Sequence, residues 1–185
     1  ITQPEADLYR LLTSLQHKEF LYEQPSFPEV EYIFKHALTQ EVAYSTVLHN
    51  QRKALHERTG QAIETLYSTK LDEHYSDLAH HYSRSGNTAK AVNFLRLAGK
   101  QAAQRSANAE AIRHFSTALE LLNTMPDAPE HMQDELSLQV ALGPALMATK
   151  GFAAPEVEKA YTRAHELCQQ IGDSPQIFPV LFALA

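Results

Sequence analysis

Short apolar stripes at helical spacing run through most of this chain and limit what it can fold into. Ala91, Leu95, Ala98 and Ala102 are separated by four, three and four residues. Residues three or four apart share one face of an α-helix, so each stripe predicts an amphipathic helix. The same spacing occurs in two further sets, Ala107, Ala111, Phe115, Ala118 and Leu122, and Val157, Ala160, Tyr161, Ala164, Leu167, Cys168 and Ile171. The sequence therefore predicts a mainly all-α fold.

Residues that begin and end helices agree with this periodicity. Pro155 suits the first position of a helix, and Glu156 and Glu158 follow in the first turn, where the helix dipole favours acidic side chains. Gly172 suits a left-handed cap at the other end. Pro144 falls inside an expected helix, so we expect a kink or break there. The helices are expected near residues 5–17, 37–46, 48–67, 72–84, 88–104, 107–123, 134–149 and 155–171, and a further one starts near 176.

One segment carries strand signals instead. Residues 19–23 and 31–35 are short and rich in aromatic side chains, and Pro25 and Pro28 lie between them. This pattern predicts a β-hairpin. A helix, two short strands and more helices would form a small winged-helix-like unit over residues 1–70. We expect an all-helical remainder over residues 71–185.

Composition excludes several classes of protein. Of the 185 residues, 44% are apolar and 21% are charged, which is typical of globular proteins. The formal net charge of −6 disfavours a general nucleic-acid binder. No apolar run approaches the roughly 20 residues that span a bilayer, and the start has no signal-peptide pattern. With a single cysteine, Cys168, we expect a cytoplasmic protein without membrane contact, and the missing initiator Met suggests a piece of a longer chain.

Small residues recur where neighbouring helices would touch, which indicates stacked helix pairs. The tetratricopeptide (TPR) pattern has Ala, an aromatic residue four positions on and Ala three further in its second helix. Ala111, Phe115 and Ala118 fit it, and the sets starting at Ala91 and Val157 fit less closely. The intervals between sets are irregular, so we predict a degenerate TPR-like helical-hairpin superhelix, with a non-repetitive bundle as the alternative. The apolar residues 178–184 lead us to expect that the superhelix continues in the parent protein.

Three stretches together resemble one family. They are residues 32–44, residues 78–82 with 105–112, and residues 141–151 running on to 154–157. They are similar to the region that follows the STAND-type, AAA-like ATPase module in large bacterial signalling proteins. Those proteins join a class III adenylate/guanylate cyclase domain, the ATPase and a long TPR region, and some relatives carry a kinase or another effector in place of the cyclase.

The resemblance implies that residues 1–70 are the winged-helix-like end of the ATPase module and that residues 71–185 begin the repeat region. It also implies a contact with the neighbouring ATPase domain, for which His36 and Glu41 are candidates. ATP and Mg are expected for the parent only, because this piece lacks the Gly-x-x-x-x-Gly-Lys-Ser/Thr loop that cradles phosphates. We expect no catalytic, cofactor-binding or metal-binding residues here, and no enzyme activity of this fragment alone.

The 10 histidines do not by themselves indicate a metal site. His80 and His81 are adjacent, so on a helix they point about 100° apart. His49 and His56 are two turns apart, and a zinc site needs three or four converging ligands. We expect hydrogen-bonded histidines, and we expect Cys168, which lies on an apolar stripe, to be a core residue rather than a nucleophile.

A helical repeat can bind a peptide on its concave face. In a TPR register that begins at Asp72, the groove-facing positions of the first helix are His80, Ser83 and Arg84, and Arg84 could pair with a partner's carboxylate. The leading hypothesis is therefore a non-catalytic protein-interaction and regulatory module in signal transduction.

Two other hypotheses stay open. Residues 1–70 could form a DNA-binding transcriptional regulator, using the short basic stretch of Arg52, Lys53 and Arg58. Acidic residues interrupt that stretch, which favours a solvated helix face or a domain contact instead. The histidines could also belong to a metal-dependent enzyme. The sequence does not reveal the partner, the signal, the effector domain or the oligomeric state.

Overall fold

The computed structural model describes residues 3–25, 30–125 and 129–172, and these are mainly helical with one small antiparallel sheet. The chain divides into two compact units, Ile1–Arg52 and Lys53–Ala185. We describe each unit by itself. The sequence placed the junction between residues 70 and 71, and the assignment of those two regions to an ATPase end and a repeat region stays a prediction.

The first unit contains the predicted hairpin. Helix α1 (Gln3–His17) leads into strand β1 (Leu21–Gln24), which pairs antiparallel with β2 (Glu31–Phe34) before helix α2 (Ala37–Thr46). Leu21 lies opposite Phe34 in the register, and Lys35 N–H donates to the Phe20 carbonyl at 2.9 Å just beyond the ladder. Lys35 also forms an ion pair with Glu19, at 2.8 Å. The order helix, strand, strand, helix is the one expected from the sequence.

The first unit has a very small core. Among its residues 7–25 and 30–52, Leu21 is the one apolar side chain that is buried. Leu8, Leu11 and Leu15 form a stripe along α1 whose exposed fractions are 55%, 58% and 38%. Burial of apolar surface is the main driving force of folding, so this unit has little stabilisation of its own.

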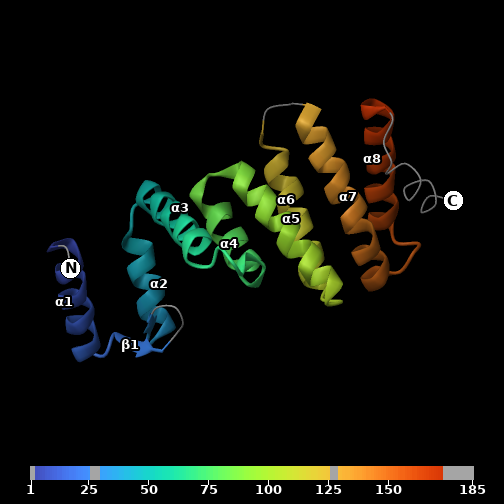
Figure 1. Cartoon of the computed structure of the whole chain (residues 1–185). Helices are drawn as coiled ribbons and strands as arrows, with labels where there is room; N and C mark the ends of the chain where they lie inside the picture. The colour runs from blue at the N-terminus through green and yellow to red at the C-terminus, as the bar shows by residue number, and fades with distance from the viewer. Residues whose placement is uncertain (1–2, 26–29, 126–128, 173–185) are drawn as a thin grey trace. The chain divides into compact units, whose positions relative to one another are not determined.

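The second unit is a series of packed helices. It begins within α3 (His49–Leu66), and a short 3-10 helix η1 (Leu71–His74) leads into α4 (Tyr75–Ser85). The series continues with α5 (Thr88–Gln104), α6 (Asn108–Leu122), α7 (Pro129–Lys150) and α8 (Pro155–Ile171). From α4 onward each helix packs against the next, as Figure 1 shows, and α5 also contacts α7. Helix α5 is therefore covered on two sides, by α4 and by α6.

Most helix ends follow the sequence signals. Pro155 is the first residue of α8, and Gly172 ends it with φ +89° and an N–H that donates to the Cys168 carbonyl at 3.0 Å. Gly86 ends α4 in the left-handed conformation, and the Asn87 side chain then caps α5 by accepting from Lys90 N–H at 3.2 Å. These contacts satisfy backbone groups that a helix end leaves unpaired.

Two helix predictions need correction. The segment expected as one helix over residues 72–84 starts with the 3-10 turn η1, and α4 begins only at Tyr75. Helix α7 starts at Pro129 rather than near residue 134, and it continues through Pro144 without a break. The helix expected near residue 176 lies outside the described residues.

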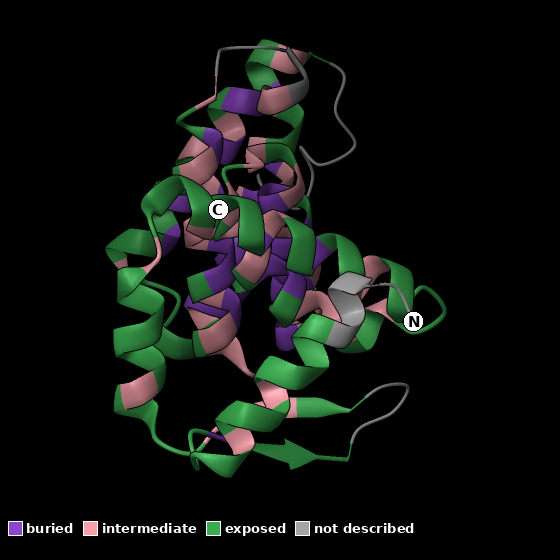
Figure 2. Ribbon diagram, turned by 90° about the vertical axis from the view of Figure 1, so that its left-hand side faces the viewer, coloured by how far each residue is buried: buried purple, intermediate pink, exposed green. Residues whose placement is uncertain are grey.

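The core of the second unit consists of small residues and aromatic rings at helix contacts. Figure 2 shows the buried residues gathered between these helices. Small residues that are buried at these helix contacts include Ala79, Ala91, Ala98, Gly99, Ala111, Ala118, Ala145, Ala160 and Ala164. Tyr82 and Phe115 are fully buried, and Cys168 is 1% exposed, so it is the core residue that its stripe predicts.

One contact recurs in three successive helix pairs. A Cβ atom on Gly99 of α5 would lie 2.5 Å from the Phe115 ring of α6, and a Cβ on Gly60 of α3 would lie 2.8 Å from the Tyr82 ring of α4. Gly143 of α7 meets the Tyr161 ring of α8 in the same way. In each pair a glycine on the first helix receives an aromatic ring from the second, where any side chain would overlap the ring.

Candidate functional site

A groove lies between α6 and α8, with α7 as its floor. Its volume is about 930 Å³. Helix α6 contributes residues at helical spacing, namely Ile112, Ser116, Leu119, Glu120 and Asn123. Stacked helices form concave surfaces, and a hollow of this volume is large enough to hold a ligand.

The bottom of the groove is apolar. Leu142 and Leu146 of α7 and Ala160 of α8 line it, and they are 7%, 5% and 3% exposed. Leu119 of α6 lies beside them and is half-buried. An apolar side chain of a ligand would therefore leave water on entering the groove, which favours binding.

One ion-pair network closes the wall between α7 and α8. Arg163 Nε and Nη2 donate to the two carboxylate oxygens of Glu135 at 2.7 and 2.9 Å, and Nη1 donates to Glu166 at 3.1 Å. The hydrogen bonds from Glu135 raise the pKa of Arg163 above its ordinary value. A two-point pair of this kind fixes the orientation of both side chains, so the wall is a firm one.

A second pair lies at the end of the groove. Lys150 donates to Glu156, and this hydrogen bond lowers the pKa of the Glu156 carboxyl. Three lining residues keep charges without an ion-pair partner among the described residues, namely Glu120, Glu158 and Lys159. Polar groups that can bond a peptide backbone are provided by Ser116, Asn123, Gln139 and Thr162.

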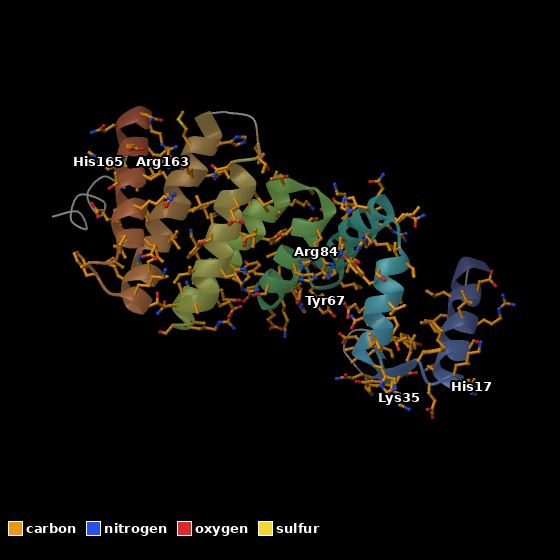
Figure 3. All side chains as sticks on the ribbon, turned by 180° about the vertical axis from the view of Figure 1, so that it is seen from behind. His17, Lys35, Tyr67, Arg84, Arg163 and His165 are labelled. Carbon is orange, nitrogen blue, oxygen red and sulfur yellow. The ribbon has the colours of Figure 1, made fainter. Side chains whose placement is uncertain are left out.

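The three residues predicted to face a groove lie elsewhere, on α4. Ser83 Oγ donates to the Ala79 carbonyl at 2.6 Å, and Arg84 donates to His80 Nδ1 at 3.1 Å, so both bond within their own helix. Helices α5, α6 and α7 separate Arg84 from Arg163, and both arginines are labelled in Figure 3. His80, Ser83 and Arg84 line neither the groove nor a smaller cavity of about 220 Å³ at α5, α6 and α7.

Three histidine rings gather where α3 meets α4. Nδ1 of His56 lies 3.0 Å from Nδ1 of His81, and the His80 ring centroid is 5.2 Å from that of His81 and 5.9 Å from that of His56. Burial lowers the pKa of His81 to about 4, and the neighbouring charges of His80 and His56 act in the same direction. Burial also lowers the pKa of His80, followed by the charge of Arg84. His80 and His81 are therefore neutral near pH 7.

This histidine cluster, His56, His80 and His81, lacks the geometry of a metal site. Across the described ranges, no three His, Cys, Asp or Glu side chains are placed so that they could hold one metal ion. The sequence predicts that His80 and His81 diverge, but it gives no sign that His56 is their neighbour, because 25 residues separate His56 from His81.

The remaining predicted residues lie in the first unit or in the part of α3 that begins the second unit. His36 precedes α2 and makes no side-chain cap, and Glu41 is exposed on the same helix, so their interdomain role stays a prediction. In the basic stretch, the Arg52 guanidinium lies over the Tyr44 ring, 5.1 Å from its centroid, while Lys53 and Arg58 are exposed. The DNA-binding alternative likewise stays a prediction.

A faint signal for the groove is present in the sequence. On α6 the core stripe of Ala111, Phe115 and Ala118 has a neighbouring stripe one residue on, Ile112, Ser116 and Leu119, which mixes polar and apolar side chains. A half-polar second stripe indicates a partly exposed face, but it does not reveal which helix lies opposite. That depends on how α7 positions α6 and α8.

Among the described residues, no helix is both long enough and apolar enough to cross a membrane.

Comparison with known proteins finds a similar protein, but no activity is assigned to that protein. No protein-family model matches the chain, and no solved structure matches it. An uncharacterized protein of Rhizobium meliloti (strain 1021) is 32% identical over 151 residues, which cover 80% of this chain. The matched part is about 15% of that protein's length, so the chain is similar to a small part of a much longer protein.

Proposed function

We propose that this chain is a non-catalytic protein-interaction and regulatory module of a larger cytoplasmic signalling protein, in which it follows a STAND-type ATPase. The upstream effector would be a class III adenylate/guanylate cyclase. The observation that carries the interaction role is the groove between α6 and α8, with its apolar floor and polar walls. The resemblance of residues 32–44, 78–82 and 141–157 supports the ATPase context, and the much greater length of the Rhizobium relative agrees with it.

The second unit is best interpreted as TPR-like. Ala111, Phe115 and Ala118 on α6 follow the pattern of a second TPR helix, and Gly99 on α5 receives the Phe115 ring. The recurrence of this contact at Gly60 and Gly143 supports a repeated helix pair over a bundle without repeats. The first unit, with its helix, hairpin and helix, would be the winged-helix-like end of the ATPase module.

Binding suits the chemistry of the groove better than catalysis does. Its lining residues in the described part of the chain include no histidine or cysteine, and most of its charged side chains pair with one another. Groups that act as a nucleophile or base must converge on one reacting atom. ATP and Mg would be bound by the ATPase domain of the parent, which His36 and Glu41 of the first unit would contact.

A peptide display experiment tests the interaction role. The immobilised chain would be screened with a random peptide library alongside two variants, Thr162→Tyr, which places a ring in the groove, and Gln51→Tyr, which changes an exposed residue on α3. We expect peptides that bind the unmodified chain and Gln51→Tyr but not Thr162→Tyr. Peptides that bind all three proteins equally, or none, would contradict a role for the groove.

A second experiment tests the regulatory role. The coding sequence on both sides of this chain would be read, and the parent protein would be expressed with the peptide selected above. We expect a phosphate-binding loop upstream, and we expect the peptide to change the affinity for ATP, because coupled sites shift each other's binding equilibria. An unchanged ATP affinity and output at saturating peptide would rule the coupling out.

A further inference from the structure

The charges along the groove are unbalanced. Its lining contains five carboxylates and three cationic side chains. The carboxylates are Glu120, Glu135, Glu156, Glu158 and Glu166, and the cations are Lys150, Lys159 and Arg163. The groove therefore has a negative potential, which a low-dielectric apolar floor strengthens.

Several of these charges form ion pairs with one another, and the carboxylates that remain unpaired lie on the two facing walls of the groove, α6 and α8. Arg163 is held by Glu135 and Glu166, and Lys150 is held by Glu156. Glu120 on α6 and Glu158 on α8 make no ion pair with any residue in the described ranges, and Lys159, which follows Glu158 in sequence, is the one lining cation that makes none either. Two carboxylates on opposite sides of an apolar floor are placed to pair with cations that flank a buried side chain.

We propose that the groove binds a segment of a partner protein in which lysine or arginine residues flank an apolar side chain. The apolar side chain would lie on Leu142 and Leu146, and the flanking cations would pair with Glu120 and Glu158. This inference rests on the proposed function, because it names the class of partner for the same groove. Apolar burial would provide affinity, and the carboxylates would select the charge of the partner.

Two other occupants fit the charge less well. Residues 173–185 of this chain contain no lysine or arginine and include Asp173, so they offer no cation to the two carboxylates. A second copy of the chain carries a formal net charge of −6, which opposes its approach to a negative groove. A basic partner segment is therefore the occupant that the lining favours.

Binding of matched synthetic peptides tests the proposal. The probe is a short fluorescein-labelled peptide in which two arginines flank a leucine, and its controls carry two glutamates or two glutamines in place of the arginines. Binding to the full chain would be measured by fluorescence anisotropy at low and high salt. We expect the arginine peptide to bind at least about tenfold more tightly than the glutamate peptide, and this ratio to fall as salt screens the charges.

A matched pair of variants locates the effect. The double variant Glu120→Gln and Glu158→Gln should weaken the arginine peptide about fivefold and leave the glutamine peptide unchanged, since exposed charge pairs contribute modestly. The double variant Glu23→Gln and Glu73→Gln removes two carboxylate charges at exposed positions outside the groove and should have no effect.

The outcomes separate this inference from the proposed function. If all three peptides bind equally and Thr162→Tyr abolishes binding, the groove is an interaction site but the preference for basic partners is wrong. If no peptide binds, both fail. Binding that appears only after residues 173–185 are removed would also overturn the inference, because this chain's own segment would then be the occupant.

Discussion

His81 is the residue whose ionisation changes most clearly with folding. Its imidazole is neutral in the histidine cluster, beside His56 on α3 and beside His80, Asp77 and Arg84 on its own helix. The folded-state pKa is about 4, and the ordinary value is 6.5. Between these two pH values the unfolded chain binds a proton that the folded chain does not. Folding stability from this group is therefore present above pH 6.5 and is lost as the pH falls towards 4.

We predict that acid destabilises the native chain more than a His81→Gln variant. Glutamine keeps a hydrogen-bonding side chain but does not titrate. From about pH 7 to about pH 5, the free energy of unfolding should fall by about 1 kcal/mol more in the native chain, a figure reduced for the partial exposure of the ring. Urea unfolding at both pH values measures this difference. Equal losses in the two proteins would show that His81 is not the titrating group, and His49→Gln on the exposed face of α3 serves as the control.

The histidine cluster also marks a limit of sequence reasoning for single residues. Cys168 and Phe115 could be placed in the core because each lies on an apolar stripe, and helical periodicity determines which side of a helix is buried. The contact between His56 and His81 joins α3 to α4, and no spacing within one helix contains that information.

At the scale of elements, Gly99 sets how closely α5 and α6 approach. An alanine in a helix is ordinarily more favourable than glycine by roughly 0.5–1 kcal/mol. Here the added Cβ would lie 2.5 Å from the Phe115 ring, and that ring is fully buried. We predict that Gly99→Ala lowers the free energy of unfolding by about 1–3 kcal/mol, because the ring cannot move without disturbing the core.

A double-mutant cycle checks the cause of this loss. Phe115→Leu removes the ring atoms that the new Cβ would overlap. If the overlap is responsible, Gly99→Ala should cost much less in the Phe115→Leu background than alone, as measured by urea unfolding. Additive effects of the two substitutions would mean that the close approach of the helices is not what the glycine provides.

Replacing Pro144 in α7 should raise the free energy of unfolding, whereas replacing Gly99 should lower it. The helix is continuous through this exposed residue, although proline has no N–H to donate to the carbonyl four residues earlier. Pro144→Ala restores that hydrogen bond and should raise the free energy of unfolding by about 1–3 kcal/mol, seen as a higher melting temperature. A lower melting temperature would indicate that the shape which proline imposes on α7 is needed for its packing with α8.

The helix boundaries show what local sequence determines. Helices α2, α5 and α8 begin and end where their sequences predict. For α5 the Asn87 cap, and for α8 Pro155 and Gly172, are signals that act within a few positions. The 3-10 turn η1 and the early start of α7 were missed because nothing in the periodicity distinguishes them from an α-helix or a loop. The groove between α6 and α8 was missed for a similar reason, since its walls come from helices that are not neighbours in sequence.

For the whole molecule, the two units differ strongly in how much apolar surface they bury. The described part of the first unit buries only Leu21, whereas the second unit has a continuous core from Leu78 to Cys168. A unit without a core does not fold cooperatively by itself.

We predict that residues 48–185, which retain the whole of α3, fold without the residues before them. This fragment should keep the helical circular dichroism and the cooperative thermal unfolding of its helices, with a melting temperature within a few degrees of the full chain. Residues 1–47 alone should show no cooperative transition. Loss of cooperativity in the longer fragment would mean that the first unit contributes to the core of the second.

The close contacts of Gly60, Gly99 and Gly143 with aromatic rings have a consequence for how the sequences of related chains diverge. Each of these glycines contacts a ring on the following helix, while the number of residues between the glycine and the aromatic residue differs from one helix pair to the next. Residues can therefore be inserted or deleted in the turns while every contact between a glycine and a ring is kept. Related chains should diverge in turn length before they diverge at these glycines. An alignment of the helix pairs at one fixed repeat length would therefore fail to match the three glycines with one another.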